Sequence, residues 1–311
     1  MWKYILKRVL QMIPVLFLVI FIVFTIMDAT PGDPVQIILG QNPPAQAVED
    51  LTKELGLDQP FLARFFNYIK NVVLHLDFGL SYRTRQPVFD GIWPKLPTTV
   101  ILAVFTVAVS TLLGVVLGII SAVKEYSAVD VTLTFTSLIF ASVPGFWLCL
   151  MLIILFSLKL HWLPSSGIGS VKHYILPVLA SAIPAAAFLA RITRSQMLEV
   201  MRQEYIRTAR AKGADNRRVI FKHALKNALM PVITIAGTSF ASALGGSMIT
   251  ERVFGLPGIG NYILMSIQNK DIPVVMGSTI FLAAVFMVIL LLVDLAYAYI
   301  NPTLRSRFAK K

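Results

Sequence analysis

The chain has 311 residues, of which 56% are hydrophobic and only 14% are charged, and its mean hydropathy is +0.73. This composition excludes an ordinary soluble globular protein, because so much apolar sequence would leave large apolar patches facing water. A lipid bilayer, by contrast, accepts apolar surface on every side of a helix. The sequence therefore predicts an all-helical integral membrane protein, and the position of its formal net charge of +12 should report its orientation.

Six long stretches without ionisable side chains predict six transmembrane helices. A helix needs about 20 residues to cross the hydrocarbon core, with a tolerated range of about 17 to 25. The stretches are Val9–Met27, Leu96–Val123, Val131–Leu158, Tyr174–Ala190, Ala228–Thr250 and Ile272–Val293. Six crossings place both termini on one side of the membrane.

The distribution of Lys and Arg predicts which side that is. Lys3, Lys7 and Arg8 precede the first stretch, which lacks a cleavage pattern and is expected to be an uncleaved signal-anchor. With the N-terminus inside, the inner segments hold 18 of the 28 Lys and Arg residues. The positive-inside rule therefore predicts cytoplasmic N- and C-termini.

Prolines and small residues are expected to interrupt or thin these helices and to let backbones approach one another. The prolines are Pro14, Pro144, Pro184 and Pro231, and the small residues include the pair Gly114-x-x-x-Gly118. Span five is also rich in small residues from Gly237 to Gly246, which predicts that it faces other helices rather than lipid.

The six stretches carry no group for ion coupling or catalysis. Secondary carriers usually keep an ionisable residue near the midplane, so this alternative is disfavoured. A membrane-embedded hydrolase is disfavoured because paired polar catalytic groups are missing. The chain also has no phosphate-binding G-x-x-x-x-G-K-[ST] motif and no metal-ligand spacing, and its one cysteine, Cys149, cannot form an internal disulfide. Energy for uphill transport would have to come from a partner.

The inner segment from Arg191 to Lys226 holds ten Lys and Arg residues. Leu198, Met201, Tyr205 and Ala209 recur at helical spacing and predict one helix. Gly213 is expected to stop this helix, and Asp215 or Asn216 to cap a second one that leads into span five. Two simpler interpretations remain open, a solvated positive-inside loop and a basic stripe on anionic lipid.

The same segment resembles a known family. Glu204-Tyr-Ile-Arg-Thr-Ala-Arg-Ala-Lys-Gly213 and His223-Ala-Leu-Lys-Asn-Ala-Leu-Met-Pro231 are similar to the cytoplasmic signature loop of ABC-importer permeases, in the oligopeptide, dipeptide and nickel branch. The wider family has Glu-Ala-Ala where this chain has Arg207-Thr-Ala209, and a loop proline where it has Lys226. By this resemblance the ATPase-coupling residues are Glu204, Tyr205, Arg207, Thr208, Ala209, Arg210, Gly213, Ala214 and Asp215.

Further strings resemble the same branch in its order. They are Pro31-Gly-Asp-Pro34, Leu55-Gly-Leu-Asp-Gln-Pro60, Asp77-Phe-Gly-Leu-Ser81, Pro97-Thr-Thr99, Glu251-Arg-Val-Phe-Gly-Leu-Pro-Gly-Ile-Gly260 and Asp294-x-x-Tyr297 near Asn301-Pro302. At the tail the family more often has Asp-Pro-Arg, whereas this chain has Asn301-Pro302-Thr303. The residues expected to shape the outer membrane face are Glu251, Phe254, Gly255, Pro257, Gly258 and Gly260.

The resemblance implies an all-α integral membrane protein with six transmembrane helices and the type I ABC-importer permease fold. The expected parts are residues 1–30 (N-terminal cytoplasmic end and first helix), 31–95 (extracytoplasmic segment) and 96–311 (five-helix core with coupling loop 191–227). The implied partners are a second permease, two cytoplasmic ATP-binding subunits, an external binding protein and membrane lipid, with no nucleic acid. ATP and magnesium would bind the partner ATPases, and this chain would hold no cofactor or metal and catalyse no reaction. Its location would be the bacterial plasma membrane.

The implied substrate is a short peptide, with nickel chelates or another small solute as the alternative, and the sequence leaves the substrate-lining residues unknown. The outer segment should help to receive the binding protein. Its apolar residues, Val48, Leu51 and Leu55 and then Phe61, Phe65 and Tyr68, predict amphipathic helices on the rim of the bundle. The aromatic side chains, including Phe66, are expected to be membrane-interface anchors rather than a ligand cage.

Overall fold

The structure is a computed structural model that describes residues 2–30, 32, 34–40 and 42–300. In this part of the chain the regular structure is helical, with one isolated antiparallel bridge between Leu80 and Pro87. The chain forms two compact units. Among the described residues, unit 1 comprises Val100–Leu256 and Ile289–Ile300, and unit 2 comprises Trp2–Thr99 and Pro257–Val288.

Unit 2 contains the long first helix and a series of short ones. They are α1 (Trp2–Asp28), α2 (Pro34–Leu39), α3 (Ala45–Glu54), α4 (Phe61–His75), α5 (Val88–Ile92), the 3-10 turn η1 (Trp93–Lys95) and α14 (Ile259–Gln268). Helices α6 (Leu96–Val123) and α15 (Ile272–Ile300) contribute residues to both units.

An aromatic cluster attaches α4 to α1. Phe65 is only 1% exposed, and its ring lies 5.6, 5.2 and 5.5 Å from the rings of Phe17, Phe21 and Phe24. Phe61 packs on the same helix, with its ring 5.4 Å from that of Phe24. Phe65 is therefore a packing residue rather than an interface anchor, because this part of the apolar stripe of α4 finds its partner in α1. For Phe61, which is half-buried, and Phe66, which is 58% exposed, the interface anchor stays a prediction.

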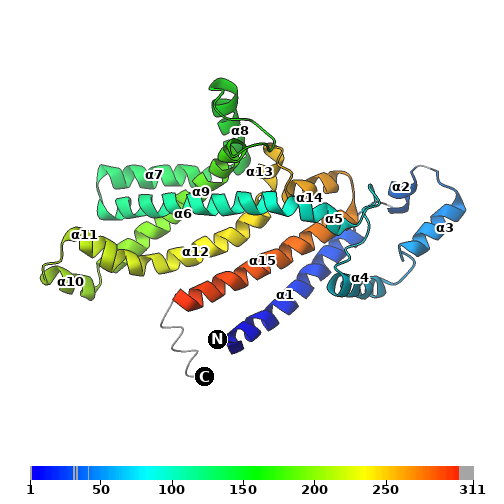
Figure 1. Ribbon diagram of the computed structural model, residues 1–311, viewed down its shortest axis with the longest axis horizontal. Helices are drawn as coiled ribbons and strands as arrows, with labels where there is room; N and C mark the ends of the chain where they lie inside the picture. The colour runs from blue at the N-terminus through cyan, green and yellow to red at the C-terminus, as the bar shows by residue number, and fades with distance from the viewer. Residues whose placement is uncertain (1, 31, 33, 41, 301–311) are drawn as a thin grey trace. The chain divides into compact units, whose positions relative to one another are not determined.

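Unit 1 is built around the long helix α9. Its elements are α7 (Ala128–Ser142), α8 (Gly145–Leu152), the π-helix η2 (Ile153–Lys159), α9 (Lys172–Met201), α10 (Glu204–Ala211), α11 (Asn216–Arg218), the π-helix η3 (Val219–Ala224), α12 (Leu225–Gly246) and α13 (Met248–Val253), together with most of α6. Helices α7, α8 and α12 all pack against α9 (Figure 1).

Two glycines allow α6 to approach α9 closely. A Cβ atom added to Gly114 would lie 2.5 Å from Cβ of Leu189, and one added to Gly118 would lie 2.5 Å from Cβ of Thr193. Real Cβ atoms do not approach so closely, so any larger residue would push the helices apart. The structure therefore confirms the close backbone approach that the Gly114-x-x-x-Gly118 pair predicted.

The third expected span is not one continuous helix. Helix α7 ends at Ser142, Val143 is extended with φ −72° and ψ 128°, and α8 begins at Gly145. The two parts are bent by 103°, and α8 turns away from α7 (Figure 1). Pro144 explains the break, because it lacks an N–H and disfavours the helical conformation of the preceding residue. Pro14, Pro184 and Pro231, by contrast, lie inside uninterrupted helices.

Five helices among the described residues are long and apolar enough to cross a membrane, or six if the bent pair α7–α8 counts as one span. Two other boundaries differ from expectation. Helix α9 continues beyond Ala190 to Met201 and so includes the first residues of the coupling loop, and span five is divided at Ser247 between α12 and α13. Pro31, Asp33 and the tail Asn301-Pro302-Thr303, which belong to the family-like strings, lie outside the described residues.

Candidate functional site

The coupling loop, residues 191–227, folds as a short helix between two longer ones. Helix α9 ends at Met201, and α10 begins at Glu204 after two intervening residues. The prediction of one helix from Leu198 to Ala209 is therefore wrong, because the chain breaks at Arg202 and Gln203. The apolar positions of that predicted helix belong to two helices, and so they do not form one continuous stripe.

The glycine turn that follows α10 agrees with prediction. Gly213 has φ +79°, in the left-handed region that side chains disfavour. A Cβ atom added there would meet nothing within 4 Å, so the backbone conformation rather than space requires glycine. Asp215 caps the next helix, since its Oδ2 accepts a hydrogen bond from the Arg217 N–H at 3.2 Å.

One buried side chain holds α10 against the rest of unit 1. Ile206 is 0% exposed and joins a cluster with Met197 of α9, Val219 and Ala224. A hydrogen bond from Asn227 Nδ2 to the Tyr205 hydroxyl, 2.8 Å long, adds a second attachment, to α12. Helix α10 is therefore fixed from one side, which leaves its other side open to solvent or to a partner.

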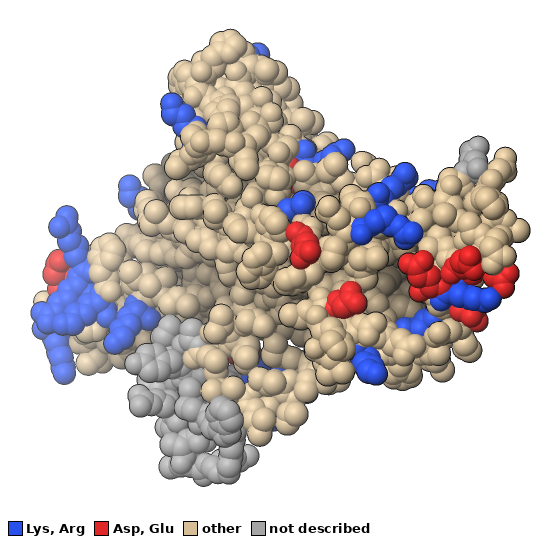
Figure 2. All heavy atoms as spheres, turned by 45° about the vertical axis from the view of Figure 1, so that its right-hand side comes forward, with Lys and Arg blue, Asp and Glu red and all other residues tan. Residues whose placement is uncertain are grey.

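The open side of α10 is charged. Glu204 and Arg207 form an ion pair of 2.9 Å with side chains 83% and 71% exposed, so it contributes little to stability. The exposed cations between α9 and α12 are Arg202, Arg207, Arg210, Lys212, Arg217, Arg218, Lys222 and Lys226. Figure 2 shows Lys and Arg gathered at the end of unit 1 where α10 and α11 lie. The arrangement presents a basic surface on a rigid support.

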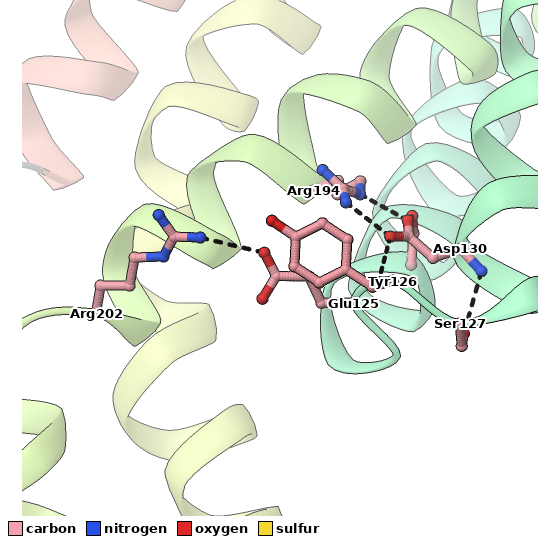
Figure 3. Close-up of polar contacts among 7 residues, drawn as sticks. Glu125, Tyr126, Ser127, Asp130, Arg194 and Arg202 are labelled. Atoms are coloured by element: carbon pink, nitrogen blue, oxygen red, sulfur yellow. Dashed lines mark hydrogen bonds and ion pairs between the residues drawn. The ribbon is translucent and has the colours of Figure 1, made fainter.

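A buried carboxylate lies beside this loop, at the start of α7 (Figure 3). The Asp130 side chain is 4% exposed, and Arg194 of α9 donates to both of its oxygens at 2.7 Å. The Tyr126 backbone N–H donates to the same carboxylate at 3.0 Å, and the Ser121 hydroxyl donates as well. The charge is therefore compensated by a two-pronged guanidinium and further donors, as a buried carboxylate requires.

A second ion pair connects the same turn to the entrance of α10. Arg202, in the break between α9 and α10, donates to Glu125 at 3.1 Å (Figure 3). Asp130 thus contacts Arg194, which lies before the end of α9, and Glu125 contacts Arg202, which lies after it. Movement of α10 about that end would have to stretch or break the contact between Arg202 and Glu125.

Sequence reasoning missed these residues because it used ionisable side chains only to mark the ends of spans. Asp130 therefore became a boundary and Arg194 one of the ten cations of the inner segment, although both lie within helices. The local pattern Ser127-x-x-Asp130 could have predicted the start of α7, since the Ser127 hydroxyl accepts the Asp130 N–H at 3.3 Å. No local signal indicates that Asp130 meets a residue 64 positions away.

A cavity of about 450 Å³ lies within unit 1 among α6, α9, α12 and α13. Its lining is rich in hydroxyl groups and small side chains, and no ionisable side chain is among its described lining residues. The hydroxyl residues are Thr106, Ser110, Ser181, Thr238, Ser239, Ser242, Ser247 and Thr250. The Thr106 hydroxyl is buried and has no hydrogen-bond partner among the described residues. The cavity can hold a polar solute by hydrogen bonds without a fixed charge.

The residues expected at the outer face are largely buried. In unit 1, Glu251 is 0% exposed and accepts a hydrogen bond from the Ser247 hydroxyl at 2.9 Å, and Phe254 is 1% exposed in a core cluster. Gly255 has φ +60°, as a turn after α13 requires. In unit 2, Pro257 is exposed, Gly258 caps α14 and Gly260 is buried.

No three His, Cys, Asp or Glu residues come together as a metal-binding group within the described part of the chain.

Comparison with known proteins identifies the class. Residues 114–306 match the sequence model of the family described as binding-protein-dependent transport system inner membrane component, and residues 1–103 match its N-terminal counterpart. The chain therefore belongs to the binding-protein-dependent transport system inner membrane components, the permease subunits of ABC importers. In this family ATP hydrolysis belongs to other subunits. The chain is a multi-pass inner-membrane protein.

Individual relatives agree over the full length of the chain. The dipeptide transport system permease protein DppB of Alkalihalophilus pseudofirmus is 39% identical, over 98% of this chain and 100% of that protein. The glutathione transport system permease protein GsiC of Escherichia coli K12 is 40% identical, over 99% and 100%.

Two solved structures share the fold. An amino acid ABC transporter matches with a TM-score of 0.51 and 16% identity, over 68% of this chain and 92% of that one. The MetNI methionine ABC transporter matches with 0.50 and 20% identity, over 69% and 96%. Both matches confirm the expected class of ABC-importer permease fold.

Proposed function

We propose that this permease forms, with a second permease subunit, the path by which an ATP-driven importer moves short peptides into the cell. The similarity to relatives named for dipeptide and glutathione transport, which spans almost the entire chain, carries this proposal. Glutathione is itself a tripeptide, so both names describe the same class of substrate.

The cavity in unit 1 supports a peptide substrate. Peptides of different sequence share amide groups, which hydroxyl side chains can bind, and differ in the charges of their side chains. A lining of Ser and Thr without fixed charge would accept many peptides and release each of them, whereas a charged trap would slow release. High affinity would then reside in the external binding protein.

The coupling loop is proposed to dock on two cytoplasmic ATPases, which would hold ATP and magnesium. Its basic surface on α10 and α11 would face the ATPase, and Asp130 and Glu125 would transmit movement of α10 to α7 and α6. Residues 31–95 would form the extracytoplasmic part that receives the binding protein, with both chain termini in the cytoplasm. ATP-driven rigid-body switching would open the path to one side and then the other.

Uptake by a deletion strain tests the substrate. A strain that lacks this gene and redundant peptide importers should lose accumulation of labelled di- to pentapeptides and recover it on complementation. If peptide uptake is unchanged by the deletion while nickel accumulation is abolished, the peptide assignment is wrong. The purified chain alone should show no vanadate-sensitive ATPase activity and should acquire it only in the assembled complex.

A further inference from the structure

A second cavity, of about 620 Å³, lies within unit 2. It is enclosed by the end of α1, the segment between α3 and α4, one face of α4, the turn around Gly79 and the first turn of α15. Its volume falls within the range of about 300 to 1,000 Å³ that is typical of small-molecule sites. None of the functions derived above uses this cavity.

Two residues that line this cavity each carry a buried polar atom without a hydrogen-bond partner among the described residues. The atoms are Nε of Arg64 and the hydroxyl of Tyr68. The two residues lie four positions apart on α4, so their side chains share one face of the helix. Buried polar groups are rarely left unpaired, so two neighbouring unpaired donors suggest a missing acceptor.

Each of the two groups can donate a hydrogen bond. The Arg64 guanidinium is permanently charged, and it is held in place by an ion pair between Nη2 and Asp28 of 2.7 Å. Burial, and to a lesser degree the charge of Asp77, raises the pKa of the Tyr68 hydroxyl well above its ordinary value, so this hydroxyl keeps its proton. Two adjacent donors, one of them cationic, match the two oxygens of a carboxylate.

The rest of the lining suits a molecule that carries both charges. Lys53, Arg64 and Arg85 supply positive charge, and Asp28 and Glu54 supply negative charge. Three amide side chains also line the cavity and can pair with peptide groups, namely Gln59, Asn67 and Asn71. Asn67 donates a hydrogen bond to Gln59 at 3.3 Å, and the remaining groups of these amides are free to meet a ligand. A phospholipid headgroup would use the cations but has no peptide group to pair with the amides.

We propose that this cavity is a binding site for a short zwitterionic peptide, whose terminal carboxylate accepts hydrogen bonds from Arg64 Nε and the Tyr68 hydroxyl. The inference rests on the proposed function, because it assigns to the permease a peptide site separate from the hydroxyl-lined cavity in unit 1. The amino terminus of the peptide would face the carboxylates of Asp28 and Glu54. The permease would thus hold a peptide at a site of its own after the binding protein releases it.

The test uses the assembled permease–ATPase complex in lipid nanodiscs without the external binding protein. Equilibrium dialysis would compare labelled dialanine with dialaninamide, which lacks the carboxylate. Tyr68→Phe removes one hydroxyl and keeps the ring, and Arg64→Gln removes the cation. Lys70→Gln is the matched control, because Lys70 is exposed on the same helix and does not line the cavity.

Dialanine should bind more tightly than dialaninamide, and Tyr68→Phe and Arg64→Gln should each weaken dialanine binding by about tenfold or more. Lys70→Gln should leave binding unchanged, and Tyr68→Phe should affect dialaninamide much less than dialanine. Equal binding of the two ligands, or unchanged affinity in Tyr68→Phe, would overturn the inference. Loss of dialanine binding when anionic phospholipid replaces zwitterionic phospholipid in the nanodisc would also overturn it and would identify a lipid site.

Peptide uptake in the presence of the binding protein separates this inference from the proposed function. If the wild-type complex imports dialanine but does not bind it without the binding protein, only the inference about unit 2 fails. If the wild-type complex imports no peptide at all, the proposed function fails first.

Discussion

Each of the two units contains an Arg–Asp pair, and the two pairs differ in how completely their polar atoms are satisfied. In unit 1 the guanidinium of Arg194 meets both oxygens of Asp130, which also accepts two further hydrogen bonds. In unit 2, Arg64 meets Asp28 through Nη2, while its Nε has no partner among the described residues. In the Arg194–Asp130 pair both carboxylate oxygens are hydrogen-bonded, so the pair is a structural contact. The Arg64–Asp28 pair leaves one donor, Arg64 Nε, for another molecule.

The largest expected effect comes from breaking the Arg194–Asp130 pair. Arg194→Met should destabilise the protein by about 3–5 kcal/mol, because it leaves the Asp130 carboxylate buried and uncompensated. Denaturant unfolding in mixed micelles would measure the loss. Arg191→Met, at an exposed position of the same helix, should change stability by no more than about 0.5 kcal/mol.

Two further variants sharpen the comparison. Adding Asp130→Leu to Arg194→Met should recover part of the stability, because removing both partners of a buried pair leaves no orphaned charge. Arg64→Met, at the more exposed pair of unit 2, should cost only about 1 kcal/mol. Equal losses from Arg194→Met and Arg64→Met would show that the two pairs do not differ as described.

The next effect concerns the glycine turns. Gly213→Val should cost roughly 1 kcal/mol or more, because its φ of +79° disfavours a β-branched residue. It should impair transport while membrane insertion persists, and Gly213→Asn should be milder, because asparagine tolerates this conformation. Gly167, with φ +91° in the connection between η2 and α9, provides the matched control.

Gly167→Val should cause similar local strain without reducing co-purification of the ATPase. Transport assays and ATPase co-purification of both valine variants would test this difference. Normal uptake by Gly213→Val would mean that the turn after α10 does not orient the coupling loop.

A smaller effect is expected from the exposed basic surface. Arg207→Glu and Arg210→Glu should weaken assembly with the ATPase, and the deficit should grow as salt is lowered, because exposed charges are screened by ions. Co-purification at two ionic strengths would measure it. If the complex is retained and only its dependence on anionic lipid changes, the basic surface contacts the membrane instead.

The smallest effect is a pH dependence in unit 2. Burial, together with the nearby charge of Asp271, raises the pKa of the Tyr82 hydroxyl from 10.0 to about 12. Between these values the unfolded chain releases the proton while the folded chain keeps it, so stability should be complete below pH 10 and fall as the pH rises to 12. Tyr82→Phe should flatten this part of the unfolding profile, and Tyr126→Phe, at a residue 82% exposed, should not.

The sequence predicted the helical membrane class, most of the spans and the glycine turn at Gly213, because these depend on local composition and backbone preference. It also predicted the close approach at Gly114 and Gly118, since small residues four positions apart have few other uses in a membrane helix. It named Pro144 among the prolines that interrupt or thin the helices, and the third span breaks there. It did not predict the 103° bend, because hydropathy reports no direction for the chain after a break.

Only the tertiary structure decided the contacts between residues far apart in the chain. Asp130 meets Arg194 and Arg202 meets Glu125 only because α6, α7 and α9 pack together. Phe65 of α4 likewise found its partners in α1. A single sequence encodes the period of a helix in neighbouring residues, but the partner of a buried charge or ring depends on the packing of the whole unit.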